Sequence, residues 1–374
     1  MLVGGGVVLA AGAGTFARIS RTPQTALLPW EQAGGPQYGD PRMMALSFAV
    51  LTPNPHNKQP WLVDLSQSDD TVVLMADLDR LLPETDPFSR QITIGLGGFL
   101  ELMTMAANAQ GYAVETELFP QGFDGAALDQ RMVARATFKP DPSVKADPLF
   151  EQVLTRRSLK EPYDLNRPVT DKALSSLIAG AGLKVLPGTS NDMALVQRLR
   201  DVTEEALRIE LTTPRTWKES VDVMRLGARA VDANPDGIDL TGRFNEAAVA
   251  AGLLSERTLL DETSQAFQGG LDYNHGLCQT SMAFVWLRTS TNTRLDQIAT
   301  GGDWLRLNLQ ATALGLGIQP MSQALQEFPE MASLYEEVHQ RLAPSGETLQ
   351  MLGRLGYGPS VNPAPRWPIE AKVI

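Results

Sequence analysis

The clearest pattern of apolar positions in the chain occurs twice. Residues 97–112 and 301–316 align without a gap, and both segments are apolar on every side, rich in small residues and matched at Gly111 and Gly315. Such a pattern is typical of a buried helix, and glycine is favoured just past a helix C-terminus. A strand-like segment follows, at 113–118 in the first copy. The pattern predicts an internal duplication, with each copy built on a buried helix that leads into a strand.

Composition restricts the class of protein. The 374 residues are 43% hydrophobic, enough for one large core or two medium ones. The net charge of −11 argues against nucleic acid or an anionic membrane as a partner. A lone cysteine, Cys278, excludes an intramolecular disulfide and a thiolate cluster. The three histidines, His56, His275 and His339, lack metal-ligand spacing, so we expect no metal site.

The N-terminal residues form a separate apolar, glycine-rich run at 2–14, followed by small residues up to Ala17. This resembles the apolar part and cleavage side of an export signal of the twin-arginine type, with its arginines expected further upstream. The run is too short to span a bilayer comfortably as a mature helix. We therefore expect a periplasmic or exported protein with no stable membrane insertion after signal removal. The alternatives are an N-terminal anchor or a buried segment, and a cytoplasmic location.

A proline-broken loop covers residues 52–61 and leads into a strand-like segment, 62–65. Pro53, Pro55 and Pro60 each fix one φ angle and restrict the residue before them, so the loop is predicted to be stiff. It presents amide side chains followed by an aromatic residue, a combination suited to the edge and face of a flat heterocycle. The alternative is a plain polar turn ahead of a strand.

Two further motifs carry basic residues. Arg156, Arg157 and Ser158 combine guanidinium forks with a hydroxyl, which suits a dianionic phosphate. Near the end of the chain, the glycine-rich segment 353–359 is followed by Arg366. The alternative for the adjacent arginines is a solvated surface pair.

Together these motifs resemble the nitroreductase family of FMN-dependent oxidoreductases, and in particular its Acg-type branch, whose members are often exported and carry two fused halves. Asn57-Lys58-Gln59-Pro60-Trp61 resembles the family's flavin-contacting loop. The resemblance implies an α+β fold, with mixed or antiparallel sheets and surrounding helices, in which two halves mimic the family homodimer. Each half lacks a motif that the other retains, so one FMN per chain is expected.

The resemblance also implies a domain organisation. A signal-like segment and linker at 1–36 precede a first half at 37–143 and a second half at 144–374. The halves are joined by a proline-bearing linker at 138–143, and the second half carries an insertion at about 211–275. An insertion of this length is usually a lid or a second packing layer. The resemblance favours a lid over the flavin, and the alternative is a helical pair remote from the site.

Carried over by motif, the phosphate ligands are Arg156, Ser158 and Arg366, with Lys160 near the ribityl chain and the pyrimidine edge. Arg354 is a candidate for a second basic residue that the family has where this chain has Ala364. The full set of expected cofactor-binding residues is Arg156, Arg157, Ser158, Lys160, Asn54, Pro55, Asn57, Gln59, Gln319, Pro320, Ser322 and Arg366. No catalytic side chain is expected, because the flavin N5 carries the redox chemistry.

The implied function is transfer of hydride or electrons through FMN to nitroaromatic, quinone-like or conjugated acceptors. NAD(P)H or another reductant is the expected donor, and the chain is expected to act as a pseudo-dimeric monomer or a loose dimer. The alternative is a protein that binds and sequesters FMN without turnover.

Overall fold

The computed structural model describes residues 22–374, so the predicted signal run at 2–14 lies outside the described residues. The first half forms a four-stranded antiparallel sheet of order β1-β2-β4-β3. Its elements are α3 (Pro41–Ala49), β1 (Trp61–Asp64), β2 (Thr71–Ala76), α4 (Arg90–Ala109), β3 (Tyr112–Leu118) and β4 (Met132–Pro140). The strands predicted at 62–65 and 113–118 correspond to β1 and β3.

The second half repeats this plan. Its elements are α5 (Asp171–Ala181), β5 (Leu186–Ser190), β8 (Ala283–Thr289), α12 (Arg294–Ala313), β9 (Gly317–Pro320), α13 (Ala332–Leu342) and β10 (Thr348–Gly356). The sheet order β5-β8-β10-β9 is the order of the first sheet, strand for strand, and every pairing is again antiparallel. The predicted α+β class and internal duplication are therefore confirmed, and the duplication includes whole sheets.

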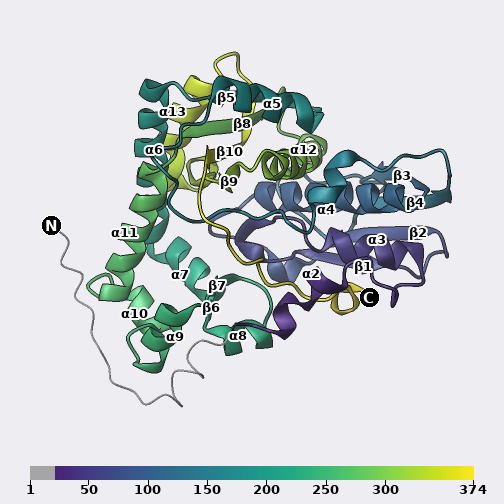
Figure 1. Ribbon diagram of the computed structural model, residues 1–374, viewed down its shortest axis with the longest axis horizontal. Coiled ribbons are helices and arrows are strands. Elements are labelled where there is room, and N and C mark those ends of the chain that lie inside the picture. Colours follow the sequence, from purple (N-terminus) through teal and green to yellow (C-terminus); the bar gives the residue numbers. More distant parts are fainter. Residues whose placement is uncertain (1–21) are drawn as a thin grey trace.

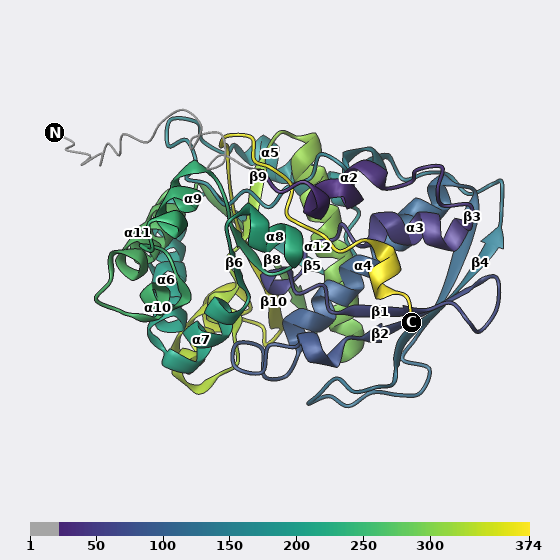
Figure 2. The ribbon, with the colours of Figure 1, turned by 90° about the horizontal axis from the view of Figure 1, so that it is seen from below.

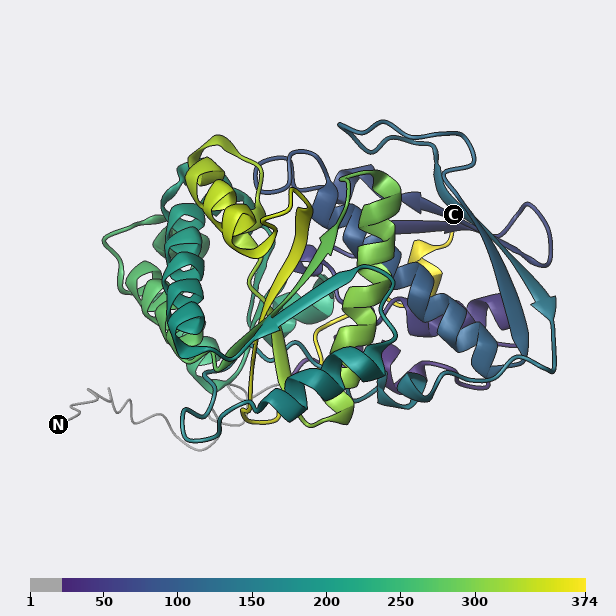
Figure 3. The same cartoon turned by 90° about the horizontal axis from the view of Figure 1, so that it is seen from above.

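Helices α4 and α12 pack against each other between the two sheets (Figure 3). A Cβ atom on Gly97 would lie 2.1 Å from the carbonyl oxygen of Ile298, and one on Gly301 would lie 1.9 Å from that of Ile94. Only glycine permits this approach of two backbones. The duplicated glycines thus set the contact between the halves. Helix α4 is apolar and long enough to cross a membrane, but most of it is buried in the core.

The chain between β5 and β8 is much longer than its counterpart between β1 and β2. It contains α6 (Met193–Thr212), α7 (Pro214–Asp222), β6 (Met224–Leu226), α8 (Ala228–Ala233), β7 (Ile238–Leu240), α9 (Arg243–Ala250), α10 (Glu256–Leu260) and α11 (Gln265–Gln279). These elements form one side of the molecule (Figure 1). The extra chain therefore begins at α6, before residue 211.

This insertion has a core of its own. Trp217 and Val221 pack with Leu259 and Phe267, and the indole Nε1 of Trp217 donates to the carbonyl oxygen of Leu259 at 2.7 Å. Leu253, in contrast, is 65% exposed. The insertion thus behaves as a small packed layer rather than a pair of loose helices.

The C-terminal residues cross from the second half to the first (Figure 2). After β10 the chain runs to Ile369, which is buried in the core of the first half, and Val373 forms a parallel bridge with Val63 of β1. The two halves are therefore interlocked as well as packed.

The predicted linker at 138–143 is only partly correct. Phe138 belongs to β4, is 3% exposed and pairs in register with Val114 of β3. Because the aromatic side chain of Phe138 is buried in the core, the strand continues past this residue. It ends at Pro140, and proline is tolerated at the end of a strand. The connection between the halves therefore begins after Pro140.

Candidate functional site

Three arginines gather around one indole ring. Trp30 lies on the short helix α2 (Leu28–Gln32), and its ring centroid is 4.8 Å from the guanidinium carbon of Arg157, 5.7 Å from that of Arg366 and 5.9 Å from that of Arg156. The indole Nε1 donates to the carbonyl oxygen of Ala364 at 2.8 Å. Residues from both motifs and from the N-terminal region are thus brought to one place, which we call the arginine cluster (Arg156, Arg157 and Arg366).

The arginine cluster lies at the C-terminal end of α3. Arg366 donates from Nε to the carbonyl oxygen of Val50 at 2.7 Å and from Nη2 to that of Thr52 at 3.0 Å. Arg156 donates from Nη2 to the carbonyl oxygen of Leu51 at 3.1 Å. Cations are favoured at this end of a helix because its last carbonyl groups lack partners within the helix. These contacts orient the guanidinium groups but do not neutralise them.

The cluster carries uncompensated positive charge. Arg156 is 4% exposed and Arg366 is 2% exposed, and no member forms an ion pair within 4.0 Å in residues 22–374. Burial, and then the charge of Arg157, lowers the pKa of Arg156 to about 10; burial, and then the charge of Arg156, lowers that of Arg366 to about 9. Nη1 of Arg156 and Nε of Arg157 are buried without a hydrogen-bond partner in the described chain. Buried cations that are left unpaired are costly, so this geometry suits a bound anion.

Ser158 and Lys160 continue from the cluster along β9. The backbone N–H of Leu159 donates to the carbonyl oxygen of Ile318 at 3.0 Å, which holds the segment beside that strand. Ser158 is half-buried, whereas Lys160 is exposed. The positive charge of Lys160 affects the pKa values of two other groups. It contributes to lowering the pKa of His56 and opposes the raised pKa of Asp239.

Asp239, on β7 of the insertion, is a site residue that sequence analysis did not identify. Burial of its carboxyl group raises the pKa of Asp239, while the charges of Lys160 and Arg366 act in the opposite direction. The insertion therefore places a hydrogen-bond acceptor beside the arginine cluster. An isolated aspartate in a long insertion has no local pattern that could have indicated this.

The proline-broken loop is strained as well as stiff. His56, Asn57 and Gln59 have φ angles of 46°, 50° and 51°, values that residues other than glycine adopt infrequently. The short turn Pro55–Asn57 is held by a bond from the backbone N–H of Gln59 to Oδ1 of Asn54 at 2.7 Å. Strain of this kind persists only where the surroundings enforce it, and it gathers at functional sites.

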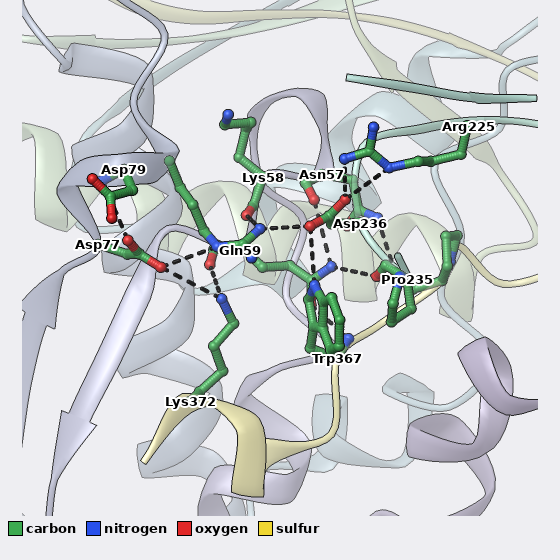
Figure 4. Close-up of polar contacts among 12 residues, drawn as sticks. Asn57, Lys58, Gln59, Asp77, Asp79, Arg225, Pro235, Asp236, Trp367 and Lys372 are labelled. Carbon is green, nitrogen blue, oxygen red and sulfur yellow. Dashed lines mark hydrogen bonds and ion pairs between the residues drawn. The ribbon is translucent and has the colours of Figure 1, made fainter. Parts of the chain in front are cut away.

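Two of the predicted ring-binding amides have protein partners. Asn57 donates from Nδ2 to the carbonyl oxygen of Pro365 at 2.9 Å and accepts at Oδ1 from Nη1 of Arg366 at 2.5 Å. Gln59 is fully buried; its Nε2 donates to the carbonyl oxygen of Pro235 at 2.8 Å and its Oε1 accepts from the N–H of Trp367 at 2.9 Å (Figure 4). Gln59 therefore joins the loop to the insertion and the tail, and direct contact between Gln59 and a cofactor stays a prediction.

Asp236 is the centre of the same junction (Figure 4). Its carboxylate accepts from Nη1 of Arg80 at 2.6 Å, from Nη2 of Arg225 at 2.6 Å and from the indole of Trp367 at 3.0 Å. Burial would raise its pKa, but these hydrogen bonds and charges lower it. Asp236 thereby links the first half, the insertion and the tail beside the arginine cluster.

The residues predicted from the second half lie on β9 and just after it. Gln319 accepts at Oε1 from Nε of Arg354 at 2.7 Å, and Ser322 donates from Oγ to the carbonyl oxygen of Leu352 at 3.2 Å. Pro320 ends β9 and pairs in register with Gly353. Arg354 also donates to the carbonyl oxygens of Leu277 and Glu161. The suggestion that Arg354 completes the arginine cluster is therefore wrong, because packing directs its guanidinium into the second half.

The corresponding region of the second half is closed. At the C-terminal end of α5, Arg306 donates from Nε to the carbonyl oxygen of Ala181 at 2.6 Å. Its other nitrogens pair with Glu101 at 2.9 Å and Asp147 at 2.7 Å. A Cβ atom on Gly180 would lie 2.3 Å from Gln310, so the side chains of α12 occupy the space beside α5. The unpaired arginine cluster therefore has no copy at this position.

Comparison with known proteins tests the resemblance to nitroreductases independently of the site geometry. No family model matches the chain. Two relatives from Mycobacterium tuberculosis strains, each named "Putative NAD(P)H nitroreductase", are 24% identical over 336 residues, which cover 86% of this chain and 87% of theirs.

Solved structures show a weaker likeness. The FMN-dependent nitroreductase NfnB from Mycobacterium smegmatis, in complex with NADPH, aligns with a TM-score of 0.38 and 15% identity over 60% of this chain and 96% of its own. NfnB from a Sphigopyxis strain aligns with a TM-score of 0.36 and 16% identity over the same shares. The similarity to the Mycobacterium tuberculosis relatives extends over most of both chains.

Proposed function

We propose that this chain is an FMN-dependent oxidoreductase of the nitroreductase type. It would take electrons from NAD(P)H, or from another reductant, and pass them to nitroaromatic, quinone-like or conjugated acceptors. The observation that carries this proposal is the arginine cluster, a group of cations whose members Arg156 and Arg366 are buried and form no ion pair within 4.0 Å in residues 22–374. The names of the Mycobacterium tuberculosis relatives support the same activity.

The residues present fit FMN. Arg156 and Arg366 would bind the terminal phosphate, because the orphaned Nη1 of Arg156 offers a charge-assisted hydrogen bond to an anion. Asp239 would accept hydrogen bonds from the hydroxyls of the ribityl chain, since its carboxyl group feels the charges of Lys160 and Arg366. The negative charge of Asp239 would repel a bound phosphate. The three positive charges of the arginine cluster would outweigh this repulsion.

The remaining residues orient the ring and adjust its surroundings. When bound, FMN supplies the two-electron redox chemistry. Lys160 would place a positive charge near the ring, which favours a reduced and anionic cofactor. The strained loop would present Asn54 and Pro55 from the first half, and Gln319, Pro320 and Ser322 would approach from the second.

We further propose that the chain carries one such site and works as a monomer that contains both halves. The arrangement at Arg306 supports this, because its ion pairs occupy the position of a second site. An Acg-type, exported protein of the periplasm fits the apolar run at 2–14, and a mature N-terminus found by mass spectrometry downstream of that run is the expected result.

The runner-up is an FMN-sequestering protein without turnover. It is favoured by the enclosure of the arginine cluster, which Trp30, the tail and the insertion surround. The two functions differ in one experiment. The yellow protein is mixed with NADPH without oxygen, and then with a nitroaromatic. An enzyme loses its colour and regains it, whereas a sequestering protein keeps its colour throughout. A flavin content near two per chain, or FAD in place of FMN, would contradict the single-site proposal.

A further inference from the structure

A histidine and a glutamate face each other where the strained loop meets the insertion. Nε2 of His56 lies 3.9 Å from Oε1 of Glu210, which is near the end of α6. The His56 side chain is 17% exposed and that of Glu210 is 5% exposed. Neither residue belongs to the arginine cluster or to the junction at Asp236.

The surroundings of Glu210 favour its protonated form. Burial raises its pKa to about 7, although hydrogen bonds from Gln326 and Ser220 oppose the shift and the charge of Glu219 adds to it. Gln326 donates from Nε2 to Oε2 at 2.8 Å, and Ser220 donates from Oγ to Oε1 at 3.3 Å. A carboxyl group of this kind carries a proton over part of the neutral range and can release it there.

The surroundings of His56 favour a neutral imidazole. Burial lowers its pKa to about 4, and the charges of Lys160, on the arginine-bearing segment, and of Lys58, on its own loop, act in the same direction. Glu210 faces Nε2, whereas the buried Nδ1 has no hydrogen-bond partner in residues 22–374. A protonated Glu210 would donate toward Nε2, so the imidazole would carry its own hydrogen on Nδ1. That buried donor has no protein acceptor in residues 22–374, which leaves it free to bond an acceptor brought in by a ligand.

We infer that Glu210 and His56 supply the proton that reduction of the acceptor consumes; this inference rests on the proposed function. A quinone becomes a hydroquinone by gaining one hydride and one proton, and a nitro group becomes a nitroso group and water by gaining the same pair. FMN, when bound and reduced by the nicotinamide, would supply the hydride. The proton leaves Nδ1 of His56 for the acceptor oxygen, while Nε2 takes the proton of Glu210, which solvent then replaces.

The separation of 3.9 Å is longer than a hydrogen bond, so the transfer requires closure by about 1 Å or one bridging water. Catalytic contacts are commonly long before substrate binds. The φ angle of 46° at His56 is consistent with an imidazole held in place for a task, because a strained backbone must be enforced by its neighbours.

The chain offers a matched control on the same helix. Glu204 of α6 contacts Nδ1 of His275 at 2.8 Å, but this pair is exposed, at 37% and 60%. Glu204→Gln therefore removes a carboxyl group from a histidine pair without affecting the site. Glu210→Gln keeps the size of the side chain at the buried pair but removes its transferable proton.

The test uses the FMN-loaded protein, reduced without oxygen and mixed with benzoquinone in a stopped-flow instrument between pH 5.5 and 9. For the wild type we expect the rate to fall as pH rises through about 7, because Glu210 loses its proton there. Glu210→Gln should abolish this pH dependence and slow the reaction at pH 6 by about a hundredfold, the size of a general-acid contribution. Glu204→Gln should match the wild type. A wild-type pH profile in Glu210→Gln would overturn the inference.

A second measurement does not depend on turnover. With three histidines in the chain, imidazole NMR signals are few enough to assign. The His56 signal should shift with a midpoint near pH 7 as Glu210 ionises, and the shift should vanish in Glu210→Gln. If the protein bound no FMN, or was not bleached by NADPH, the proposed function would fail while this titration could still be observed. If Glu210→Gln did not fold, His56→Gln would carry the kinetic test, with unchanged rates overturning the inference.

Discussion

In both halves, arginine side chains bind backbone carbonyls at the C-terminal end of a helix. Carboxylates balance the arginine in only one of the two halves. At the end of α5, Arg306 binds the last carbonyl of the helix and is balanced by Glu101 and Asp147. At the end of α3, Arg156 and Arg366 bind the carbonyls of Leu51 and Val50, just past the helix, with no ion-pair partner in the described residues. A helix end requires hydrogen-bond donors, but it does not require an excess of buried charge.

This difference separates folding from function. The neutral arrangement at Arg306 is what a stable interior needs, and it holds α5, α4 and the start of the second half together. The charged arrangement at α3 is unfavourable by itself, as the lowered pKa values of Arg156 and Arg366 show, because burial and mutual repulsion both disfavour their charged forms. The duplicated plan therefore contains one position that contributes stability and one at which we propose that an anion binds.

The largest effect is expected at the balanced position. Arg306→Met should lower the free energy of unfolding of the flavin-free protein by about 3 kcal/mol, because two half-buried carboxylates lose their arginine and Glu101 keeps only a longer pair with Lys184, at 3.7 Å. Urea titration followed by circular dichroism measures this, and FMN affinity should not change. If FMN affinity fell as well, the two positions would not be functionally distinct.

Arg156→Met tests the charged position. FMN affinity should fall by about tenfold to a hundredfold, since a charge-assisted hydrogen bond contributes about 1.5–3 kcal/mol. The flavin-free variant should be as stable as the wild type or more stable, because a buried and repelled cation has been replaced by an apolar side chain of similar length. Fluorescence titration with FMN and thermal unfolding give the two values. If the variant were destabilised but still bound FMN tightly, Arg156 would only stabilise the end of α3 and would not bind the cofactor.

Trp30→Leu should have a smaller effect on the same property. A cation–π contact contributes about 0.5–1 kcal/mol, and a loss of that size should lower the affinity about twofold to fivefold through faster release of FMN. Dilution of the loaded protein into apo-flavodoxin-type scavenger measures that release rate. An unchanged rate would mean that the indole only packs on the cluster.

The smallest effect concerns inorganic phosphate. Phosphate at a concentration equal to its dissociation constant should stabilise the flavin-free wild type by about 0.4 kcal/mol. Arg306→Met should retain this response, and Arg156→Met should lose most of it. Differential scanning calorimetry at constant ionic strength distinguishes specific binding from screening; equal responses in both variants would indicate screening alone.

The fold was largely predictable because its strongest signals are local. Gly97 and Gly301 lie in apolar helices whose periodicity and flanking residues are present in the sequence itself, and the two helices have the same length in the structure. Pro53, Pro55 and Pro60 likewise define a stiff loop by their own geometry.

The site was less predictable because its charge balance depends on packing between distant segments. Glu204 and Glu210 are both glutamates on an amphipathic helix, and only the fold buries one and exposes the other. Trp30 precedes the arginines by more than a hundred residues and carries no motif. The Gln59 motif was recognised, but its side chain is bound to Pro235 and Trp367, contacts that exist only once the insertion and tail have docked.

The crossing of the C-terminal tail has a consequence for biosynthesis. Arg366 completes the arginine cluster and Val373 pairs with β1, yet both lie within the last nine residues of the chain. A nascent chain can fold its early segments during translation, but the cofactor site stays incomplete while these residues are still inside the ribosome. If the chain binds FMN as proposed, capture of the cofactor would have to wait until the segment through Arg366 has docked, and a chain truncated before Arg366 would be colourless.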